Sequence, residues 1–308
     1  MSDELKTIID FIRYGASRFA AAGLSFGHGY DNALDEATQL TLHALHLPHD
    51  LQPAYGQARL VAEEKKAVLD LFERRIRDRK PACYLTGEAW FADLSFKCDE
   101  RALVPRSPIA ELIEHGYEPW RNGRPLNRVL DLCTGGGCIA IASAHYLPEA
   151  LVDGVDISEG ALSLARENAE RLLVADRTRL LHSDLFSAIE GETYDLIVTN
   201  PPYVTHAEVD ALPDEYRHEP ENGLRAGNDG LDIALQILAD APTFLNEDGF
   251  LICEIGEAER ALVELLPQVP FNWIEFKVGQ MGIFQIERED LLTWHREIAA
   301  LAAERRGA

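Results

Sequence analysis

Residues 194–203 (YDLIVTNPPY) place side chains with useful chemistry directly after an apolar run. Leu196–Val198 predicts a short buried strand, which must end at the following prolines because proline cannot donate a hydrogen bond to a sheet. An amide, two fixed carbonyls and an aromatic face then come from four consecutive residues, Asn200, Pro201, Pro202 and Tyr203. This set suits the binding of a planar NH2 group, and the alternative is a plain Asn-Pro turn.

A glycine turn lies upstream, in residues 129–140 (VLDLCTGGGCIA), between a predicted strand and a predicted helix. Glycine lets the backbone approach a ligand closely, and a helix N-terminus favours an anionic group. Cys133 occupies the first glycine position of a GxGxxG pattern, and no third glycine stands at the required offset. A dinucleotide site is therefore disfavoured, although a glycine turn alone is weak evidence for any ligand.

Two acids follow the next two predicted strands. Asp156 ends the segment LVDGVD and can accept hydrogen bonds from both hydroxyls of a ribose. Its alternative role is to cap the next helix, for which Ser158 serves equally well. Asp184 could accept from the exocyclic amine of adenine, with Leu185 beside the ring, and its alternative role is that of a turn acid.

Strands and helices alternate from Arg128 onward, which predicts an α/β fold with a doubly wound parallel sheet. In such a sheet, ligands bind at the carboxyl ends of the strands, so the glycine turn, Asp156, Asp184 and Asn200 should converge on one crevice. The predicted strands are Arg128–Leu132, Leu151–Val155, Arg179–Leu181, Leu196–Val198, Phe250–Cys253, Phe271–Phe276 and Gly282–Glu287; helices are predicted at about 138–146, 159–172, 230–245 and 257–266, and after Glu289.

The chain before this sheet divides into two parts. Residues 1–82 predict a small all-helical domain, and 83–104 predict a linker with a hairpin, so that 105–308 form the second domain. Arg106, in the rigid stretch 104–108 (VPRSP), could contact a carbonyl or carboxylate of a substrate, or the stretch is only a spacer. The basic run 74–80 is read as cations at a helix C-terminus, in preference to a contact with an acidic partner such as RNA.

The charge and the cysteine content disfavour several classes of binding function. The formal net charge of −23 argues against a general affinity for nucleic acid or an anionic membrane and favours basic partners. The five cysteines include no CxxC pair, so no metal site is expected. An odd cysteine number and the lack of a secretory leader predict a cytoplasmic protein, and no apolar stretch reaches transmembrane length.

Together, the segments DLCTGGG, VDIS, SDLF and NPPY resemble the class I S-adenosylmethionine-dependent methyltransferases over about residues 104–288. Their fold is a seven-stranded, mostly parallel sheet. Enzymes that methylate adenine in DNA share NPPY with the HemK-type enzymes, which methylate glutamine side chains of proteins. The helical N-terminal part and LVPRSP resemble the HemK type. Further segments are similar to its PrmB branch, namely 14–19, 26–29, 104–108, 215–220 and 227–231.

The resemblance implies S-adenosylmethionine as the cofactor. Its methionine part would lie at the glycine turn, its ribose at Asp156 and its adenine at Asp184 and Leu185. Asn200 and Pro201 would each accept one hydrogen of the substrate amide, and Tyr203 would pack against the amide plane. No catalytic histidine is implied. The further residues implied are Asp131, Thr134, Gly135 and Gly137 for the cofactor, which Asn200 would also contact, and Pro202 and Arg106 for the substrate.

The implied reaction is methylation of a glutamine side-chain amide, at N5, in a basic protein of the large ribosomal subunit, the third in its numbering. Stable DNA binding, membrane association and a bound metal are not expected, and no oligomeric state is predicted. Three alternatives stay open: methylation of the Gly-Gly-Gln motif of peptide-release factors, methylation of adenine N6 in DNA, and a non-catalytic role in ribosome assembly.

Overall fold

The computed structural model describes residues 4–276 and 282–306. A seven-stranded sheet forms its larger part, with the strand order β5-β4-β3-β6-β7-β9-β8. The five strands from β5 to β7 run parallel, and β9 and β8 are antiparallel additions at one edge. The strands are β3 (Arg128–Leu132), β4 (Leu151–Asp156), β5 (Thr178–His182), β6 (Tyr194–Thr199), β7 (Leu245–Glu254), β8 (Asn272–Trp273) and β9 (Ile283–Glu287).

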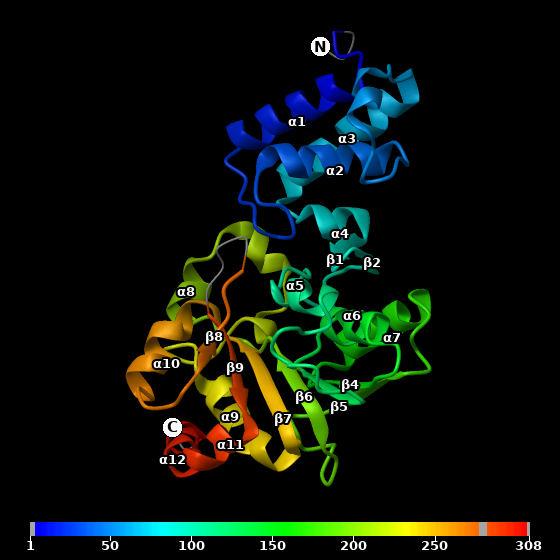
Figure 1. Cartoon of the computed structure of the whole chain (residues 1–308). Helices are drawn as coiled ribbons and strands as arrows, with labels where there is room; N and C mark the ends of the chain where they lie inside the picture. Colours follow the sequence, from blue (N-terminus) through cyan, green and yellow to red (C-terminus); the bar gives the residue numbers. More distant parts are fainter. Residues whose placement is uncertain (1–3, 277–281, 307–308) are drawn as a thin grey trace.

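Helices cover both faces of this sheet, so the expected three-layer α/β architecture is confirmed (Figure 1). Helices α5, α6 and α7 pack with one set of buried strand residues, and α9 to α12 pack with the other. The helices of this part are α5 (Ile109–Glu114), α6 (Cys138–Tyr146), α7 (Glu159–Arg171), α8 (His206–Ala211), α9 (Asp232–Phe244), α10 (Glu259–Leu265), α11 (Arg288–Thr293) and α12 (His295–Arg306).

The chain before residue 82 is helical, as expected, and lies at one end of the molecule (Figure 1). Its helices enclose a core of their own, in which the rings of Phe19 and Phe72 meet edge to face at 5.2 Å. A short helix and a two-stranded hairpin connect it to the sheet. These elements are α1 (Ile8–Ala21), α2 (Ala33–Ala44), α3 (Ala62–Asp78), α4 (Ala82–Thr86), β1 (Glu88–Phe91) and β2 (Leu94–Lys97). The boundaries at residues 82 and 104 stay a prediction.

The last strand before β9 is much shorter than predicted. Of the expected strand Phe271–Phe276, only Asn272 and Trp273 pair with β9. The apolar alternation there reflects aromatic packing, because the Phe271 ring lies 4.7 Å from Phe284 and 6.0 Å from Trp273. β8 lies at the edge of the sheet, so its apolar side chains can pack in this aromatic cluster although only two of its residues pair with β9.

The basic run at the end of α3 is also more than a set of exposed cations. Arg75 is fully buried and donates to Glu36 of α2 at 2.5 Å, and its Nη1 lies 3.5 Å from Glu215. Arg79 donates to Glu215 as well, at 3.2 Å. These ion pairs connect the N-terminal helices to the segment 214–218, which follows the Asn-Pro-Pro-Tyr turn.

Candidate active site

A cavity of about 1360 Å³ opens at the carboxyl ends of the parallel strands. The turns after β3, β4, β5 and β6 all contribute to it, as the position of ligands in such sheets leads one to expect. The loop before α5 and the start of α10 complete its wall. Of the candidate residues named from the sequence, ten line it: Arg106, Thr134, Gly135, Asp156, Asp184, Leu185, Asn200, Pro201, Pro202 and Tyr203.

The other two candidates, Asp131 and Gly137, lie beneath the glycine turn rather than on the cavity wall. Asp131 is fully buried, and its Oδ2 accepts from the Thr134 hydroxyl at 2.6 Å and from the Ala140 backbone N–H at 3.0 Å. Burial raises the pKa of Asp131 to about 7. Its carboxyl group therefore ties the turn to the start of α6, which fixes the shape of the cofactor loop indirectly.

Cys133 supplies the bend that a glycine would otherwise make. Its φ of 58° lies in the left-handed region, which residues with a side chain seldom occupy. The residue also lines the cavity. The departure from the glycine pattern seen in the sequence is thus accommodated by the backbone, and the turn keeps its path.

Asp156 sits at the end of β4 with its carboxylate held by two backbone groups. The N–H groups of Gly135 and Ser158 donate to it, each at 2.8 Å. Burial raises the pKa of Asp156, and these donors oppose the shift. Ser158 is the N-cap of α7, because its hydroxyl accepts from the Ala161 N–H at 3.2 Å. Asp156 is thus free of the capping role and faces the cavity.

The turn after β5 is shaped by Ser183. Its hydroxyl donates to the Leu185 carbonyl at 2.6 Å and accepts from the Ala188 N–H at 3.0 Å. Leu185 has a φ of 47° in this turn. Asp184 and Leu185 both reach the cavity wall as a result, next to Asp156 on the neighbouring strand.

The Asn-Pro-Pro-Tyr turn begins directly after β6, whose last residue, Thr199, donates to the Leu132 carbonyl at 2.8 Å. This hydrogen bond ties the end of β6 to the end of β3, beside the glycine turn. Tyr203 is held in turn by Glu254, since its hydroxyl donates to Oε1 at 3.0 Å. The ring of Tyr203 is therefore fixed at the wall of the cavity.

Arg106 lines the cavity, but its guanidinium group is bound to a protein carboxylate. It donates to both oxygens of Glu219, at 2.6 and 2.9 Å. Glu219 also accepts from the Val104 N–H at 3.0 Å and lies 3.7 Å from the buried His28 ring. The expected direct contact of Arg106 with substrate stays a prediction, and the pair fixes the VPRSP segment in place.

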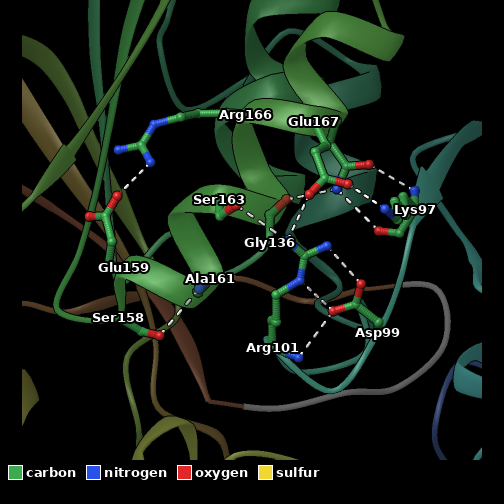
Figure 2. Close-up of polar contacts among 11 residues, drawn as sticks. Lys97, Asp99, Arg101, Gly136, Ser158, Glu159, Ala161, Ser163, Arg166 and Glu167 are labelled. Carbon is green, nitrogen blue, oxygen red and sulfur yellow. Dashed lines mark hydrogen bonds and ion pairs between the residues drawn. The ribbon is translucent and has the colours of Figure 1, made fainter.

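A second set of polar contacts anchors the loop after the hairpin to α7 (Figure 2). Arg101 donates to Asp99 at 2.8 Å, to Glu167 at 2.7 Å and to Ser163 at 3.3 Å. The side chain of Asn168 accepts from the Lys97 N–H at 2.7 Å and donates to the Gly136 carbonyl at 3.0 Å. The hairpin, α7 and the glycine turn are thereby joined on one side of the cavity.

Sequence reasoning missed Glu254, Glu219 and Ser107. Glu254 lies at the end of β7, next to β6 in the sheet, which is the same kind of strand-end position that identified Asp156. That signal was available in the sequence. Ser107 and Glu219 lie in the segments 104–108 and 215–220, to which the resemblance already pointed. Their contacts were not predictable, because they reach the site from a linker and from an irregular segment.

Residues 4–276 and 282–306, which the structure describes, hold no group of three or more His, Cys, Asp or Glu side chains that could bind a metal ion. Within the same ranges, no helix is both long and apolar enough to cross a membrane.

Comparison with known proteins agrees with this geometry. A family model described as the methyltransferase small domain matches residues 121–215. The ribosomal protein uL3 glutamine methyltransferase of Xanthomonas campestris is 67% identical over 304 residues, which cover 99% of this chain and 98% of the relative. The enzyme of the same name from Neisseria meningitidis is 49% identical over 94% of this chain and 96% of its own length.

Among solved structures, a ribosomal protein L11 methylase from Lactobacillus delbrueckii is similar at 24% identity with a TM-score of 0.41, over 59% of this chain and 80% of that one. The two curated relatives match nearly from end to end, so the resemblance predicted from the sequence is confirmed. The chain belongs to the family of ribosomal protein uL3 glutamine methyltransferases.

Proposed function

We propose that this protein transfers a methyl group from S-adenosylmethionine to the side-chain amide nitrogen of a glutamine in ribosomal protein uL3, in the cytoplasm. The observation that carries the proposal is a single cavity lined both by the turns after β3, β4 and β5 and by the Asn-Pro-Pro-Tyr turn. Membership of the uL3 glutamine methyltransferase family supports the choice of substrate.

The cofactor fits the polar groups on the side of the cavity that the turns after β3, β4 and β5 form. The carboxylate of Asp156 retains acceptor capacity beyond its two backbone donors, which suits the hydroxyls of a ribose. The turn around Gly135 would hold the methionine part, and Asp184 with Leu185 would hold the adenine. When bound, S-adenosylmethionine supplies an electrophilic methyl group on a sulfonium sulfur.

The Asn-Pro-Pro-Tyr side of the cavity must orient a poor nucleophile, because the lone pair of an amide nitrogen is delocalised into the carbonyl. The Asn200 side-chain oxygen and the Pro201 carbonyl would each accept one amide hydrogen, which would hold the nitrogen in position to attack the methyl group. The same acceptors stabilise the positive charge that develops on nitrogen. Pro202 and Tyr203 close the site against the amide plane. Once the nitrogen carries the methyl group it is strongly acidic, so its surplus proton would pass to water at the open side of the cavity, and S-adenosylhomocysteine would be the second product.

The charge of the protein suits a basic substrate. At a net charge of −23, the enzyme attracts a cationic ribosomal protein over a distance and repels nucleic acid and anionic membranes. Stable binding to DNA or to a membrane is therefore not part of the proposal. The N-terminal helices, residues 1–82, are proposed to recognise the substrate protein, since ion pairs connect them to the segment after the Asn-Pro-Pro-Tyr turn.

The test is transfer of radiolabelled methyl from S-adenosylmethionine to purified uL3, followed by mass spectrometry of the modified peptide. Asn200→Ala is expected to lower kcat by about a hundredfold or more, because one of two amide acceptors is lost. Asn246→Ala is the matched control, since this side chain binds Asp195 at the amino end of β6, away from the cavity.

Absence of label on uL3, or label unchanged by Asn200→Ala, would overturn the proposal. The same assay should include a peptide-release factor and adenine-containing DNA as competing substrates. Label on either of these in place of uL3 would redirect the assignment to the corresponding alternative.

A further inference from the structure

Glu254 occupies a position beside the Asn-Pro-Pro-Tyr turn that follows from the register of the sheet. β6 and β7 run parallel, and Thr199 pairs with Cys253. The next residue on each strand is Asn200 on one side and Glu254 on the other, so the two side chains emerge together at the strand ends. Glu254 is buried, with 5% of its surface exposed, and it lines the cavity.

Two side-chain hydroxyls donate hydrogen bonds to this carboxylate, and the Asn200 side chain is a further partner. The Ser107 hydroxyl donates to Oε2 at 2.5 Å, and the Tyr203 hydroxyl donates to Oε1 at 3.0 Å. The side-chain amide of Asn200 also acts on Glu254 as a hydrogen-bond partner. Burial raises the pKa of Glu254, whereas all three partners lower it, so each of them stabilises the ionised form. For Asn200, such an interaction requires its NH2 group as the donor.

The two Glu254 oxygens accept the hydroxyl hydrogens of Ser107 and Tyr203, and a carboxylate in this role has no hydrogen to offer Asn200. It therefore distinguishes the two ends of the Asn200 amide, drawing Nδ2 toward itself and leaving Oδ1 for the cavity. Without Glu254, the Asn200 amide could rotate by half a turn and point its own NH2 group at the NH2 group of the substrate glutamine. Two hydrogen-bond donors would then face each other and repel the substrate. The orientation that the substrate needs is the orientation that Glu254 selects.

We propose that Glu254 is a positioning residue for methyl transfer, which acts through Asn200 and Tyr203 by fixing the Asn200 oxygen toward the substrate amide and the Tyr203 ring at the wall. This inference rests on the proposed function. It assigns to Glu254 an effect on the rate of transfer and none on the binding of the cofactor, because Asp156 and the glycine turn lie on other strands.

Glu254→Gln tests it with little change of volume. Glutamine carries its own NH2 group, which competes with the donors of Ser107, Tyr203 and Asn200 and permits the Asn200 amide to turn over. We expect kcat on uL3 to fall by about tenfold to a hundredfold, as for other misplaced reacting groups. The KM for uL3 and the calorimetric affinity for S-adenosylhomocysteine are expected to stay within about twofold of wild type. These two readouts separate a positioning role from a loss of binding.

The matched control is Asp195→Asn, which removes a carboxylate at the amino end of the neighbouring strand β6 that lies outside the cavity and accepts from Asn246 at 2.6 Å. This variant is expected to keep the wild-type kcat. If Glu254→Gln fails to fold, Ser107→Ala tests the same positioning role, since it removes one hydrogen-bond donor from Glu254 without a change of charge. We expect a loss of at least about threefold in kcat, with unchanged cofactor affinity.

An unchanged kcat in Glu254→Gln would overturn the inference, and so would a loss of kcat that is matched by a loss of S-adenosylhomocysteine affinity. Both results leave the proposed function standing, because wild-type protein still labels uL3. Failure of the wild-type protein to label uL3 would instead remove the proposed function, and this inference with it.

Discussion

Asp131 carries no solvent-exposed surface and leaves its Oδ1 without a hydrogen-bond partner among the described residues. Burial is the main cause that raises its pKa to about 7, and the Thr134 and Ala140 donors only partly oppose it. A carboxyl group whose pKa is raised on folding adds stability below its ordinary pKa and loses that contribution as the pH rises through about 7. The folded protein is therefore expected to be more stable at pH values at which Asp131 is protonated.

Asp131→Asn tests this at the scale of one residue, because asparagine imitates the protonated carboxyl group at every pH. The free energy of unfolding of wild type, relative to this variant, should fall between pH 5 and pH 8, since only wild type must ionise a buried group. Urea unfolding at intervals of one pH unit measures the difference. A difference that stays constant across this range would show that Asp131 does not titrate there.

The sequence predicted which residues lie at the strand ends of the site. It did not predict which hydrogen-bond partners each of them has. Acids and amides at strand ends identify Asp156, Asp184 and Asn200, because a parallel sheet brings those ends together. The resemblance implied that Asp131 contacts the cofactor, whereas its partners Thr134 and Ala140 keep it beneath the turn. Such partners depend on the path of the loop, which residue spacing does not reveal.

At the scale of elements, the glycine turn joins β3 to α6 under two different constraints. Gly135 has a φ of 55° and open space where a Cβ would lie. Gly137 has a φ of 83°, and a Cβ there would come within 2.7 Å of Ile141 and 2.9 Å of the Ala165 Cβ. Gly135 thus needs only an unusual backbone, whereas Gly137 also permits α6 to pack closely on α7.

Gly137→Ala and Gly135→Ala separate these constraints. We expect Gly135→Ala to cost about 1–2 kcal/mol in the free energy of unfolding, from left-handed strain alone. Gly137→Ala should cost about 1–3 kcal/mol more, because overpacking adds to the strain. Urea unfolding of both variants measures the difference, and equal losses would contradict the close packing of α6 on α7.

Most elements could be predicted because apolar periodicity and glycine or proline mark them directly. The predicted strand Arg128–Leu132 and the predicted helix at residues 138–146 have the observed bounds. β7 is longer than predicted, Leu245–Glu254 in place of Phe250–Cys253, and its register with β6 places Glu254 beside Asn200. Strand register is set by packing between distant segments, so the contact that Glu254 makes was not visible in the sequence.

At the scale of the whole molecule, buried charges connect the N-terminal helices to the segment that follows the Asn-Pro-Pro-Tyr turn. Arg75 donates to Glu36 at 2.5 Å and to the Ser25 carbonyl at 3.0 Å, and it lies 3.5 Å from Glu215. The sequence placed Arg75 among exposed helix-end cations, since a single chain pattern does not reveal which surface a second segment will cover.

Arg75→Met is expected to break this connection, because it leaves the carboxylates of Glu36 and Glu215 buried with one fewer cation. Removal of one partner from a buried ion pair costs about 3–5 kcal/mol in stability. Arg77→Met is the matched control on the same helix, since Arg77 is exposed and pairs with its neighbour Asp78. Urea unfolding should place the control close to wild type and Arg75→Met well below it. Limited proteolysis of Arg75→Met should release the N-terminal helices first, and coincident unfolding of the two variants would refute a role for Arg75 in joining the two parts.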